Sequence, residues 1–465
     1  MDKTFQDLEI AIRENTVEKF VLDVIGSHST STLKDAEKYY RGENPFLSTF
    51  NKSLTLKDGK NSVEIDTKPA VSVMSGIFKG IVTHKVGRLL DNPVSVSIGG
   101  VAGGEKESPT QNVSDHLGDG FDTQVKQLAT FASIHGVCYA FYNNGSIEVF
   151  KATEYVPLVD ERTGAHKAGV RYWRVNVNKP YIVQLFTMDG YTEWRRADGG
   201  ELTDKEEKSY TNYIPTGGAG FVATTKPRRG KAYSDYPIIP WYVNPFHESD
   251  LTAPIKGKID AYDCKETAYI DEALKMKFIQ WVFKGYGGDV RKLQSMLKTM
   301  RQVGFISGDH ASDDTSIESK QMDIPYLSHA NTQERIETNI YRDAQIMHPI
   351  MFRTGAVTAT EIQAVMRQED TMMNGMENEA RKAIAALLKL AGVNFESITF
   401  SHKTIIDGLA QVQMLNTGVP DLPFEYRLKY NPAIPQEDLE QIVMRHEAEQ
   451  IGIDDGLGDM EVETA

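Results

Sequence analysis

The sequence predicts an α+β fold that is mainly helical, and three observations lead to this prediction. Before residue 136 and again after residue 253, apolar residues recur three or four positions apart, which is the spacing of amphipathic helices. Between these parts, residues 137–194 form short runs of alternating apolar and polar residues, a pattern typical of antiparallel strands. Two of these runs flank Asn143, Asn144 and Gly145, which favour a tight hairpin turn.

The N-terminal half is expected to begin with helix over residues 1–41, closed by a turn at 40–45. An amphipathic stretch at 77–90 predicts another helix, which breaks before Pro93 into a short strand at 94–98, because proline cannot continue a helix. The pattern then predicts a helix at 121–135, strands at 137–142, 146–150, 170–175, 181–186 and 191–194, and a polar, loop-rich region at 198–235.

The C-terminal half contains two helical segments that flank a small insert. Pro254 suits the first turn of a helix, and apolar residues continue at helical spacing to about residue 278. A second helical segment occupies 326–349, with its clearest periodicity at 331–347. The insert between them, 279–325, predicts a strand at 279–283, a helix at 290–301 and a strand at 303–307.

A helix break follows the second of these segments. The pattern is interrupted from His348 to Val357, and a new helix is expected from Thr358 to about residue 391. Thr358 and Glu361 form a capping box, and Gly392 is a typical helix stop. A helix of roughly 34 residues spans about 50 Å, which is more typical of scaffolding in an assembly than of one compact core. Further along, the sequence predicts a strand at 395–401, helices at 404–416 and 436–450, and an acidic tail.

Composition narrows the class of protein. A chain of 465 residues is long enough for two to four domains. Its net charge of −14 argues against an outer surface that grips nucleic acid by counterion release. Cys138 and Cys264 have no metal-ligand spacing, which favours a reducing compartment. Without an apolar signal segment or a run of about 20 apolar residues, we expect a soluble protein made in a cytoplasm, with no membrane partner.

The sequence offers little for catalysis. The phosphate-loop, nucleophile-elbow, zinc-helix and dinucleotide-loop motifs are missing, and the histidines are scattered. We therefore expect no enzyme, no cofactor and no metal site. The insert carries a basic cluster that is either a surface for DNA or an acidic partner, or simply a solvated helix face. Its members are Lys284, Arg291, Lys292, Lys298 and Arg301. Arg353, in the helix break, is equally suited to a phosphate contact and to an acidic neighbour.

Four segments together resemble the portal proteins of tailed bacteriophages, in the family typical of long-tailed phages of Gram-positive hosts. They are Lys38 to Gly42; residues 77–94; residues 239–251 running into 255–263; and the helix break. Their order and spacing are similar to the family from about residue 38 to 450. One turn departs from the family pattern, because Asp91 and Asn92 stand where a glycine and a basic residue are usual.

The resemblance implies a portal-type architecture with a wing, a two-helix stem, a small α/β clip and a helical crown. The wing would be 1–253, with helices and the β meander, and the stem would be 254–278 and 326–349. The clip would be 279–325. The remaining parts follow in order along the chain: a tunnel loop at 350–359, a long wing helix and strand at 360–399, and the crown and C-terminal tail at 400–465.

The resemblance also implies a function. Family members form a ring, here expected to have twelve subunits, at one capsid vertex of the virion, after assembly in the host cytoplasm. Double-stranded DNA is packaged and ejected through the channel. The ring binds the terminase large subunit, then head-completion (adaptor) proteins, and also contacts major capsid and scaffolding proteins. The residues expected to face DNA are Arg353, Thr354, Gly355, Ala356, Val357 and Thr358, while the basic cluster of the clip would contact the motor, an adaptor or DNA.

Charge agrees with a conduit. Twelve copies at −14 each give about −168 for the ring, and an electronegative lumen would discourage anionic DNA from sticking. A missing phosphate loop is also expected if an external ATPase drives translocation. Two alternatives stay open at this stage. One is another phage head–neck adaptor, which would normally be shorter and lack two stem helices. The other is a metal-dependent nucleic-acid enzyme, which would need carboxylates that converge on a metal.

Overall fold

The computed structural model describes most of the chain before residue 402. The described residues are 3–50, 54–58, 61–65, 69, 71–97, 110–143, 145–210, 213–215, 221–223, 233, 235–276, 279–284, 316–321, 326–348 and 359–401. The chain divides into two compact units: residues 1–355 with 364–401, and residues 356–363 with 402–465. Except for 359–363, the described residues belong to the first unit.

The N-terminal part is helical, as predicted, but consists of separate helices. They are α1 (Phe5–Arg13), α2 (Val17–Ser27), α3 (Ser31–Arg41) and α4 (Pro45–Phe50). Asn15 ends α1 in a left-handed conformation with φ of 55°, and Gly42 ends α3 with φ of 79°. In both places the N–H of the left-handed residue and the N–H of the next residue donate to carbonyl oxygens of the last helical turn, which the helix leaves free.

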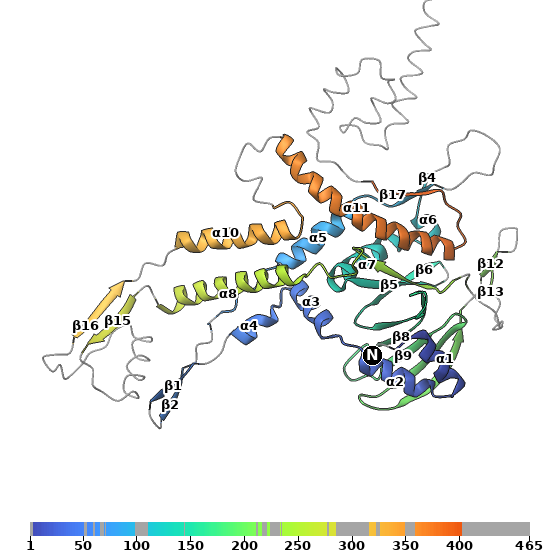
Figure 1. The fold of residues 1–465 in the computed structure, drawn as a ribbon, viewed down its shortest axis with the longest axis horizontal. Coiled ribbons are helices and arrows are strands. Elements are labelled where there is room, and N and C mark those ends of the chain that lie inside the picture. The colour runs from blue at the N-terminus through green and yellow to red at the C-terminus, as the bar shows by residue number, and fades with distance from the viewer. Residues whose placement is uncertain are drawn as a thin grey trace, which may run out of the picture. The chain divides into compact units, whose positions relative to one another are not determined.

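The strands form separate antiparallel sheets (Figure 1). The five-stranded sheet has the order β11-β10-β9-β8-β7, and two three-stranded sheets have the orders β14-β5-β6 and β17-β3-β4. The strands of these sheets are β3 (Ser95–Ser97), β4 (Thr110–Asn112), β5 (Val137–Asn143), β6 (Ser146–Lys151), β7 (Tyr155–Val159), β8 (His166–Trp173), β9 (Tyr181–Phe186), β10 (Gly190–Arg196), β11 (Leu202–Ser209), β14 (Ile238–Tyr242) and β17 (Ser397–Thr399). Two-stranded sheets are formed by β1 (Leu54–Asp58) with β2 (Asn61–Ile65), β12 (Tyr213–Pro215) with β13 (Phe221–Ala223), and β15 (Ile279–Lys284) with β16 (Ser316–Gln321).

The α+β prediction and the β5–β6 hairpin are confirmed, but the region 198–235 was wrongly predicted as loop. It contains β11, which pairs with β10, and the short β12 and β13. The strand β11 is almost entirely polar, so hydrophobic alternation could not reveal it. Its backbone hydrogen bonds to β10, together with ion pairs such as Lys208 to Glu193 at 3.7 Å, hold it at the sheet edge, where charged side chains are common.

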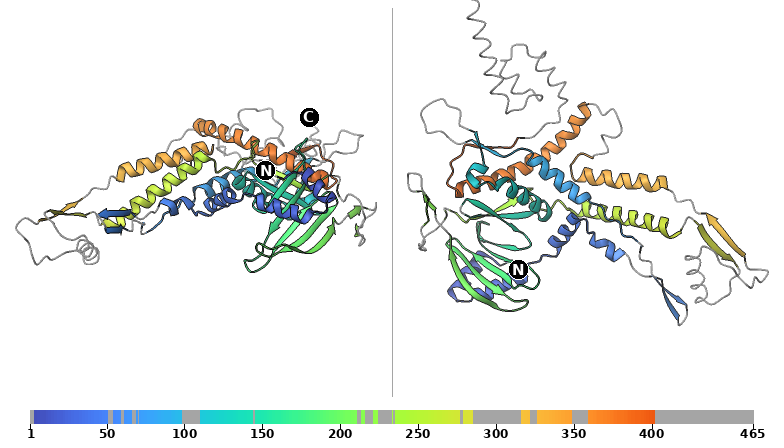
Figure 2. Two further views of the ribbon diagram at one scale, coloured as in Figure 1. Left: turned by 60° about the horizontal axis from the view of Figure 1, so that its bottom comes forward. Right: turned by 180° about the vertical axis from the view of Figure 1, so that it is seen from behind.

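Two hydrophobic clusters organise the unit. The smaller one packs α1 and α2 against the five-stranded sheet through Leu8, Phe20, Val21, Val170 and Trp194, among others, and these helices lie along that sheet in Figures 1 and 2. The larger cluster joins α3, the sheet β14-β5-β6 and the helices α5 (Ile77–Leu89) and α7 (Phe121–His135). It also takes in the start of α8 (Ala253–Met276), the end of α10 (Tyr326–Asp343) and α11 (Ala359–Leu390). The core therefore gathers elements from nearly the whole described sequence.

The predicted long helix after the break is confirmed as α11, with 32 residues. It ends at Gly392, whose φ is 75°, as the sequence predicted. The helix predicted at 331–347 is present as α10 but ends at Asp343. The helix expected at 290–301, the strand at 303–307, and the helices at 404–416 and 436–450 lie outside the described residues. So does the capping residue Thr358.

A buried cluster of tyrosines joins the five-stranded sheet to the sheet β14-β5-β6. The Tyr155 hydroxyl lies 2.7 Å from His166 Nε2 and 3.0 Å from the hydroxyl of Tyr236. The ring of Tyr139 lies 4.6 Å from that of Tyr155, centroid to centroid. Burial lowers the pKa of His166 from 6.5 to about 4, because a charged imidazole is poorly solvated there. The two sheets are thus joined through an imidazole that folds in its neutral form.

We expect this imidazole to make the protein acid-sensitive. The unfolded chain binds more protons than the folded chain between pH 6.5 and pH 4, so the stability contributed by neutral His166 is complete above pH 6.5. It is lost as the pH falls toward 4, by up to about 3 kcal/mol. Urea unfolding measured at about pH 7 and about pH 4.5 should show a smaller pH dependence in His166→Gln than in the wild type. His116→Gln, outside the cluster, is the control. An equal pH dependence in wild type and His166→Gln would contradict the expectation.

Candidate functional site

The residues that the sequence singled out as a functional site lie mostly outside the described part of the chain. This is true of Arg353, Thr354, Gly355, Ala356, Val357 and Thr358, and of Arg291, Lys292, Lys298 and Arg301. The fifth basic residue, Lys284, is the last residue of β15, where its backbone pairs with Ser316 of β16. The predictions about these side chains therefore stay predictions. What the structure does describe is how the helices on either side of them are held.

The helices α8 and α10 form an antiparallel pair (Figure 2). At one end, the ammonium group of Lys258 on α8 is paired with Asp343 on α10. In the middle, Gln333 Nε2 of α10 donates to Glu266 Oε2 at 2.8 Å and to the Tyr262 carbonyl oxygen at 3.2 Å. Further along, the rings of Tyr269 and His329 stack with centroids 4.0 Å apart. The pair is thus joined along its described length by polar and aromatic contacts, and β15 and β16 lie between the two helices in sequence.

The first half of α8 is fastened to the N-terminal helices by buried carboxylates. The Tyr39 hydroxyl of α3 donates to Asp260, which also accepts from Lys256 Nζ at 2.9 Å. One turn later, Asp263 accepts from Asn44 Nδ2 at 2.8 Å and from the Ser75 backbone N–H at 3.0 Å. We call these residues, Tyr39, Asn44, Ser75, Asp260 and Asp263, the α8 root.

The carboxylates of the α8 root are largely removed from water. Asp263 is 1% exposed and Asp260 is 7% exposed. Burial raises the pKa of Asp263, against the opposing effect of the hydrogen bonds from Asn44 and Ser75. Burial, together with the hydrogen bond to Asp260, likewise raises the pKa of the Tyr39 hydroxyl. Their hydrogen bonds offset the free-energy cost of burying these carboxylates. Because the donors lie at fixed positions, the α8 root specifies how α8 sits on the N-terminal helices.

Segments far apart in the sequence meet around the same region. Lys85 of α5 is 6% exposed and pairs with Asp250, just before α8, at 2.8 Å. Next to it, Ser249 Oγ donates to the Ile134 carbonyl oxygen at 2.6 Å, at the end of α7. Three of the segments that suggested a family, around residues 38–42, 77–94 and 239–263, are therefore in direct contact. The contacts that these segments make with one another explain their residue types.

The end of α10 is a helix stop that the sequence pattern did not show. Gln345 has a φ of 58°, in the left-handed region. Its N–H donates to the Arg342 carbonyl oxygen at 3.1 Å, and the N–H of Ile346 donates to the Tyr341 carbonyl oxygen at 3.2 Å. This is the hydrogen-bond pattern that usually has glycine at the left-handed position. Glutamine is uncommon there, which is why the helix was expected to continue.

Residues 344–348, between this helix stop and the break, are packed. Ala344, Ile346 and His348 are at most 6% exposed. His348 Nε2 lies 3.4 Å from Glu337 Oε1 of α10, and its ring meets that of Tyr341 edge-on with centroids 4.5 Å apart. The chain is therefore held against α10 up to the last described residue before the break.

On the other side of the break, α11 carries a buried carboxylate. Glu369 is 2% exposed, and its Oε1 lies 2.6 Å from His84 Nε2 and 3.5 Å from Arg88 Nη1, both on α5. Burial raises the pKa of Glu369, but His84, Arg88 and a hydrogen bond from the Met347 backbone together hold it below its usual value. Arg88 also contacts Asp370 through Nη2 at 2.6 Å. We call Glu369, Asp370, His84, Arg88 and Met347 the helix junction.

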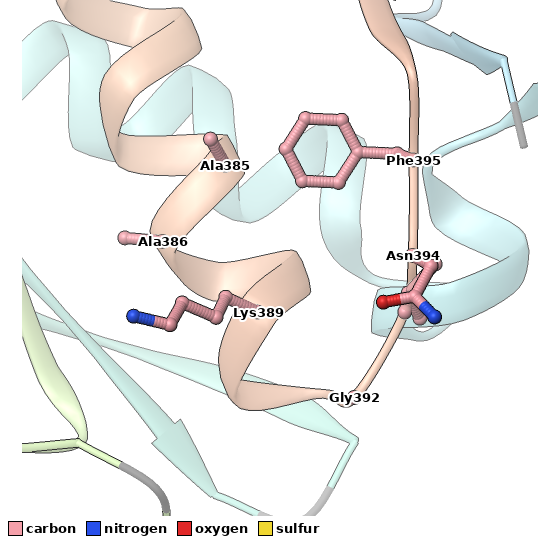
Figure 3. A pocket seen from close by; sticks show the side chains of 7 residues that line it. Ala385, Ala386, Lys389, Gly392, Asn394 and Phe395 are labelled. Carbon is pink, nitrogen blue, oxygen red and sulfur yellow. The ribbon is translucent and has the colours of Figure 1, made fainter. Parts of the chain in front are cut away.

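Two hollows in the described surface have linings without a catalytic constellation. One, of about 440 Å³, lies at the C-terminal end of α11 (Figure 3) and has Lys389 as the charged member of its described lining. The described residues around it are Ala385, Ala386, Lys389, Gly392, Val393, Asn394 and Phe395. A smaller hollow of about 80 Å³ lies beside Pro93. Within the described ranges, no three His, Cys, Asp or Glu side chains are grouped to hold a metal ion. None of the helices described has the length and apolar character to cross a membrane.

The sequence did contain a signal for the residues that were missed. Glu369 falls on the apolar stripe of α11, four residues after Val365 and four before Met373. Asp263 likewise follows Ile259 by four positions on α8. A charged residue on the buried face of a helix must find partners, so such positions indicate a specific junction. The partners of Asp263, just before α4 and just before α5, and those of Glu369, on α5, could not be read from the sequence.

We expect removal of the Asp263 carboxylate to destabilise the protein. Asp263→Ala leaves the Asn44 amide and the Ser75 N–H without their acceptor, and the free energy of unfolding should fall by about 3 kcal/mol. Urea unfolding followed by circular dichroism measures this change. The control is Glu334→Ala on the exposed face of α10, which should change stability by less than about 0.5 kcal/mol. Equal effects from the two substitutions would refute the assignment.

We expect Gln345→Gly to stabilise the protein. A side chain in the left-handed conformation costs about 1 kcal/mol, and glycine removes this strain while keeping both backbone hydrogen bonds. The melting temperature should rise by about 1 °C. The matched control is Gly392→Gln at the equivalent position of α11, which should lower it. A melting temperature that falls in Gln345→Gly would show that the glutamine side chain makes a stabilising contact of its own.

Comparison with known proteins identifies the family. The model of the phage portal protein family, SPP1 Gp6-like, matches residues 22–453. The portal protein of Bacillus phage SPP1 is 25% identical over 489 aligned residues, covering 98% of this chain and 92% of that protein.

Two solved structures of gene transfer agent particles are also similar. One is the neck of an empty particle, computed with sixfold symmetry, with 11% identity and a TM-score of 0.40, covering 78% of this chain and 90% of the other. The other is the native virion, with 12% identity and a TM-score of 0.39, covering 76% and 88%. From the family match, the chain belongs to the phage portal proteins of the SPP1 Gp6-like family, which are structural, non-enzymatic components of phage particles.

Proposed function

We propose that this protein forms a homo-oligomeric ring of twelve subunits at one capsid vertex, and that double-stranded DNA is packaged and later ejected through its channel. The family match over residues 22–453 is the observation that carries the proposal. In this scheme the α8–α10 pair is the stem, and 279–325, which includes β15 and β16, is the clip. Residues 350–359 form the tunnel loop, 1–253 and 360–399 the wing, and 400–465 the crown and C-terminal tail.

The fastening of the helices supports this division. A channel-lining helix must keep its position while DNA, a dense polyanion, moves past it. The α8 root joins α8 to α3 and to the segment before α5 through buried hydrogen bonds. The contacts along α8 and α10 then keep that pair together. The stem is thus tied to the wing by interactions that specify one arrangement.

Charge supports a conduit that does not bind DNA tightly. Twelve chains at −14 each carry about −168, and repulsion from the phosphates disfavours sticking. In this setting Arg353, Thr354, Gly355, Ala356, Val357 and Thr358 would form the DNA-facing surface of each subunit. The basic residues Lys284, Arg291, Lys292, Lys298 and Arg301 of the clip would contact the terminase large subunit and then the head-completion proteins. Major capsid and scaffolding proteins would surround the ring at the vertex.

The tunnel-loop assignment makes a direct prediction. Replacing 353–357 by glycine and serine should leave ring assembly intact and reduce DNA packaging by about tenfold or more, because a charge-assisted phosphate contact of about 1.5–3 kcal/mol per subunit is lost. Native mass spectrometry measures assembly, where a particle near twelve times 52.0 kDa is expected. A nuclease-protection assay measures packaged DNA.

The control for this experiment is Glu334→Ala, exposed on α10, which should package DNA like the wild type. Wild-type packaging by the 353–357 variant would overturn the tunnel-loop assignment. A protein that stays monomeric and joins an existing ring would favour the head–neck adaptor instead.

A further inference from the structure

We infer that Glu369 is a positioning residue that fixes the register of α11 on α5, and so the place where α11 begins after the break. This inference rests on the proposed function, because it concerns the helix that follows the segment expected to face DNA. It adds a role for residues outside that segment.

The first step is that one carboxylate connects two helices. Glu369 belongs to α11, and its partners His84 and Arg88 belong to α5. His84 and Arg88 are four residues apart and therefore lie on one face of α5. The helix α11 is thus fastened to this face through a group that is 2% exposed.

The second step is that these contacts fix the register of α11. Arg88 uses one guanidinium nitrogen for Glu369, at 3.5 Å, and the other for Asp370, at 2.6 Å. Two successive helical residues point about 100° apart, and moving a helix by one residue shifts it by about 1.5 Å. A planar guanidinium meets both carboxylates in only one register. Rotation or sliding of α11 by one residue would therefore break both contacts.

The third step separates positioning from general stability. The helix α11 is already held by apolar side chains such as Met373, Met376, Ala380, Ile384 and Leu387, which are at most 4% exposed. Apolar contacts are not directional and tolerate small shifts along the helix axis. Burying a carboxylate adds little stability, because desolvation opposes it, but its directional contacts select one arrangement of the helices. The charge of Glu369 is therefore better explained as fixing the register of α11 than as stabilising the contact between the helices.

The fourth step concerns the length of helix beyond the junction. Ten residues of α11 precede Glu369, from Ala359 to Gln368, which corresponds to about 15 Å of helix. A small tilt of α11 at Glu369 is therefore enlarged at Ala359, where the helix begins. Loss of the Glu369 contacts should consequently shift the start of α11.

The experiment compares full-length Glu369→Gln with Glu334→Gln, a matched control that neutralises an exposed carboxylate on α10, outside the helix junction. Glutamine keeps the size of the side chain and removes its charge. Amide hydrogen exchange of the assembled ring should be faster by about tenfold or more at 366–372 in Glu369→Gln, without change in α8. Glu334→Gln should exchange like the wild type. Packaging should fall in Glu369→Gln and not in Glu334→Gln.

Should Glu369→Gln fail to fold, Arg88→Lys keeps the positive charge, cannot meet both carboxylates, and should give the same local increase in exchange. Wild-type exchange at 366–372 in these variants, or an equal effect from Glu334→Gln, would overturn the inference. So would faster local exchange with undiminished packaging. Failure of the proposed function is recognised separately. In that case the variant with 353–357 replaced would itself package DNA normally.

Discussion

The arrangement of the described helices depends on the pairing of buried carboxylates on α8 and α11. Asp260 and Asp263 are held by donors from α3, from the segment before α4 and from the segment before α5. Each of these groups would carry a large desolvation penalty if it lost its partners. Alternative placements of α8 on the N-terminal helices are therefore strongly disfavoured. Apolar packing supplies the adhesion, and the carboxylates select the geometry.

The same device recurs at the helix junction. Glu369 and Asp263 both lie at positions where the helix pattern calls for an apolar side chain, and both accept hydrogen bonds from a different helix or segment. At Asp263 a backbone N–H takes part as well, from Ser75. Because a backbone donor cannot change rotamer, it ties the path of the main chain to the carboxylate. In the proposed ring, identical subunits must repeat one geometry, which such contacts specify.

The ends of the helices are determined partly by the local sequence and partly by tertiary packing. Gly42 and Gly392 end α3 and α11 in the left-handed conformation, and glycine adopts this conformation without strain. Gln345 ends α10 in the same way, although its side chain makes this unfavourable. The buried side chains of Ala344, Ile346 and His348 explain why the turn persists. Packing around residues 344–348 therefore imposes a backbone conformation that the residue type at 345 does not favour.

Much about this protein was determined by the sequence itself. Periodicity located α7, the β5–β6 hairpin, α8 and α11, because amphipathic patterns and turn residues act over a few positions. The order of short motifs also sufficed to indicate the family, which the match over residues 22–453 confirmed. The polar strand β11 and the early end of α10 were not predicted. They depend on backbone pairing to β10 and on packing around Ile346, and neither leaves a pattern in the local sequence.

Only the tertiary structure decided which charged residues act together. Asp263 and Glu369 stood out on apolar stripes, yet their partners lie 219 residues away in Asn44 and 285 residues away in His84. A hydrogen bond between such distant residues depends on how whole helices dock, and docking is fixed by the shapes of many side chains at once. The spacing of residues along the chain therefore does not predict these partners.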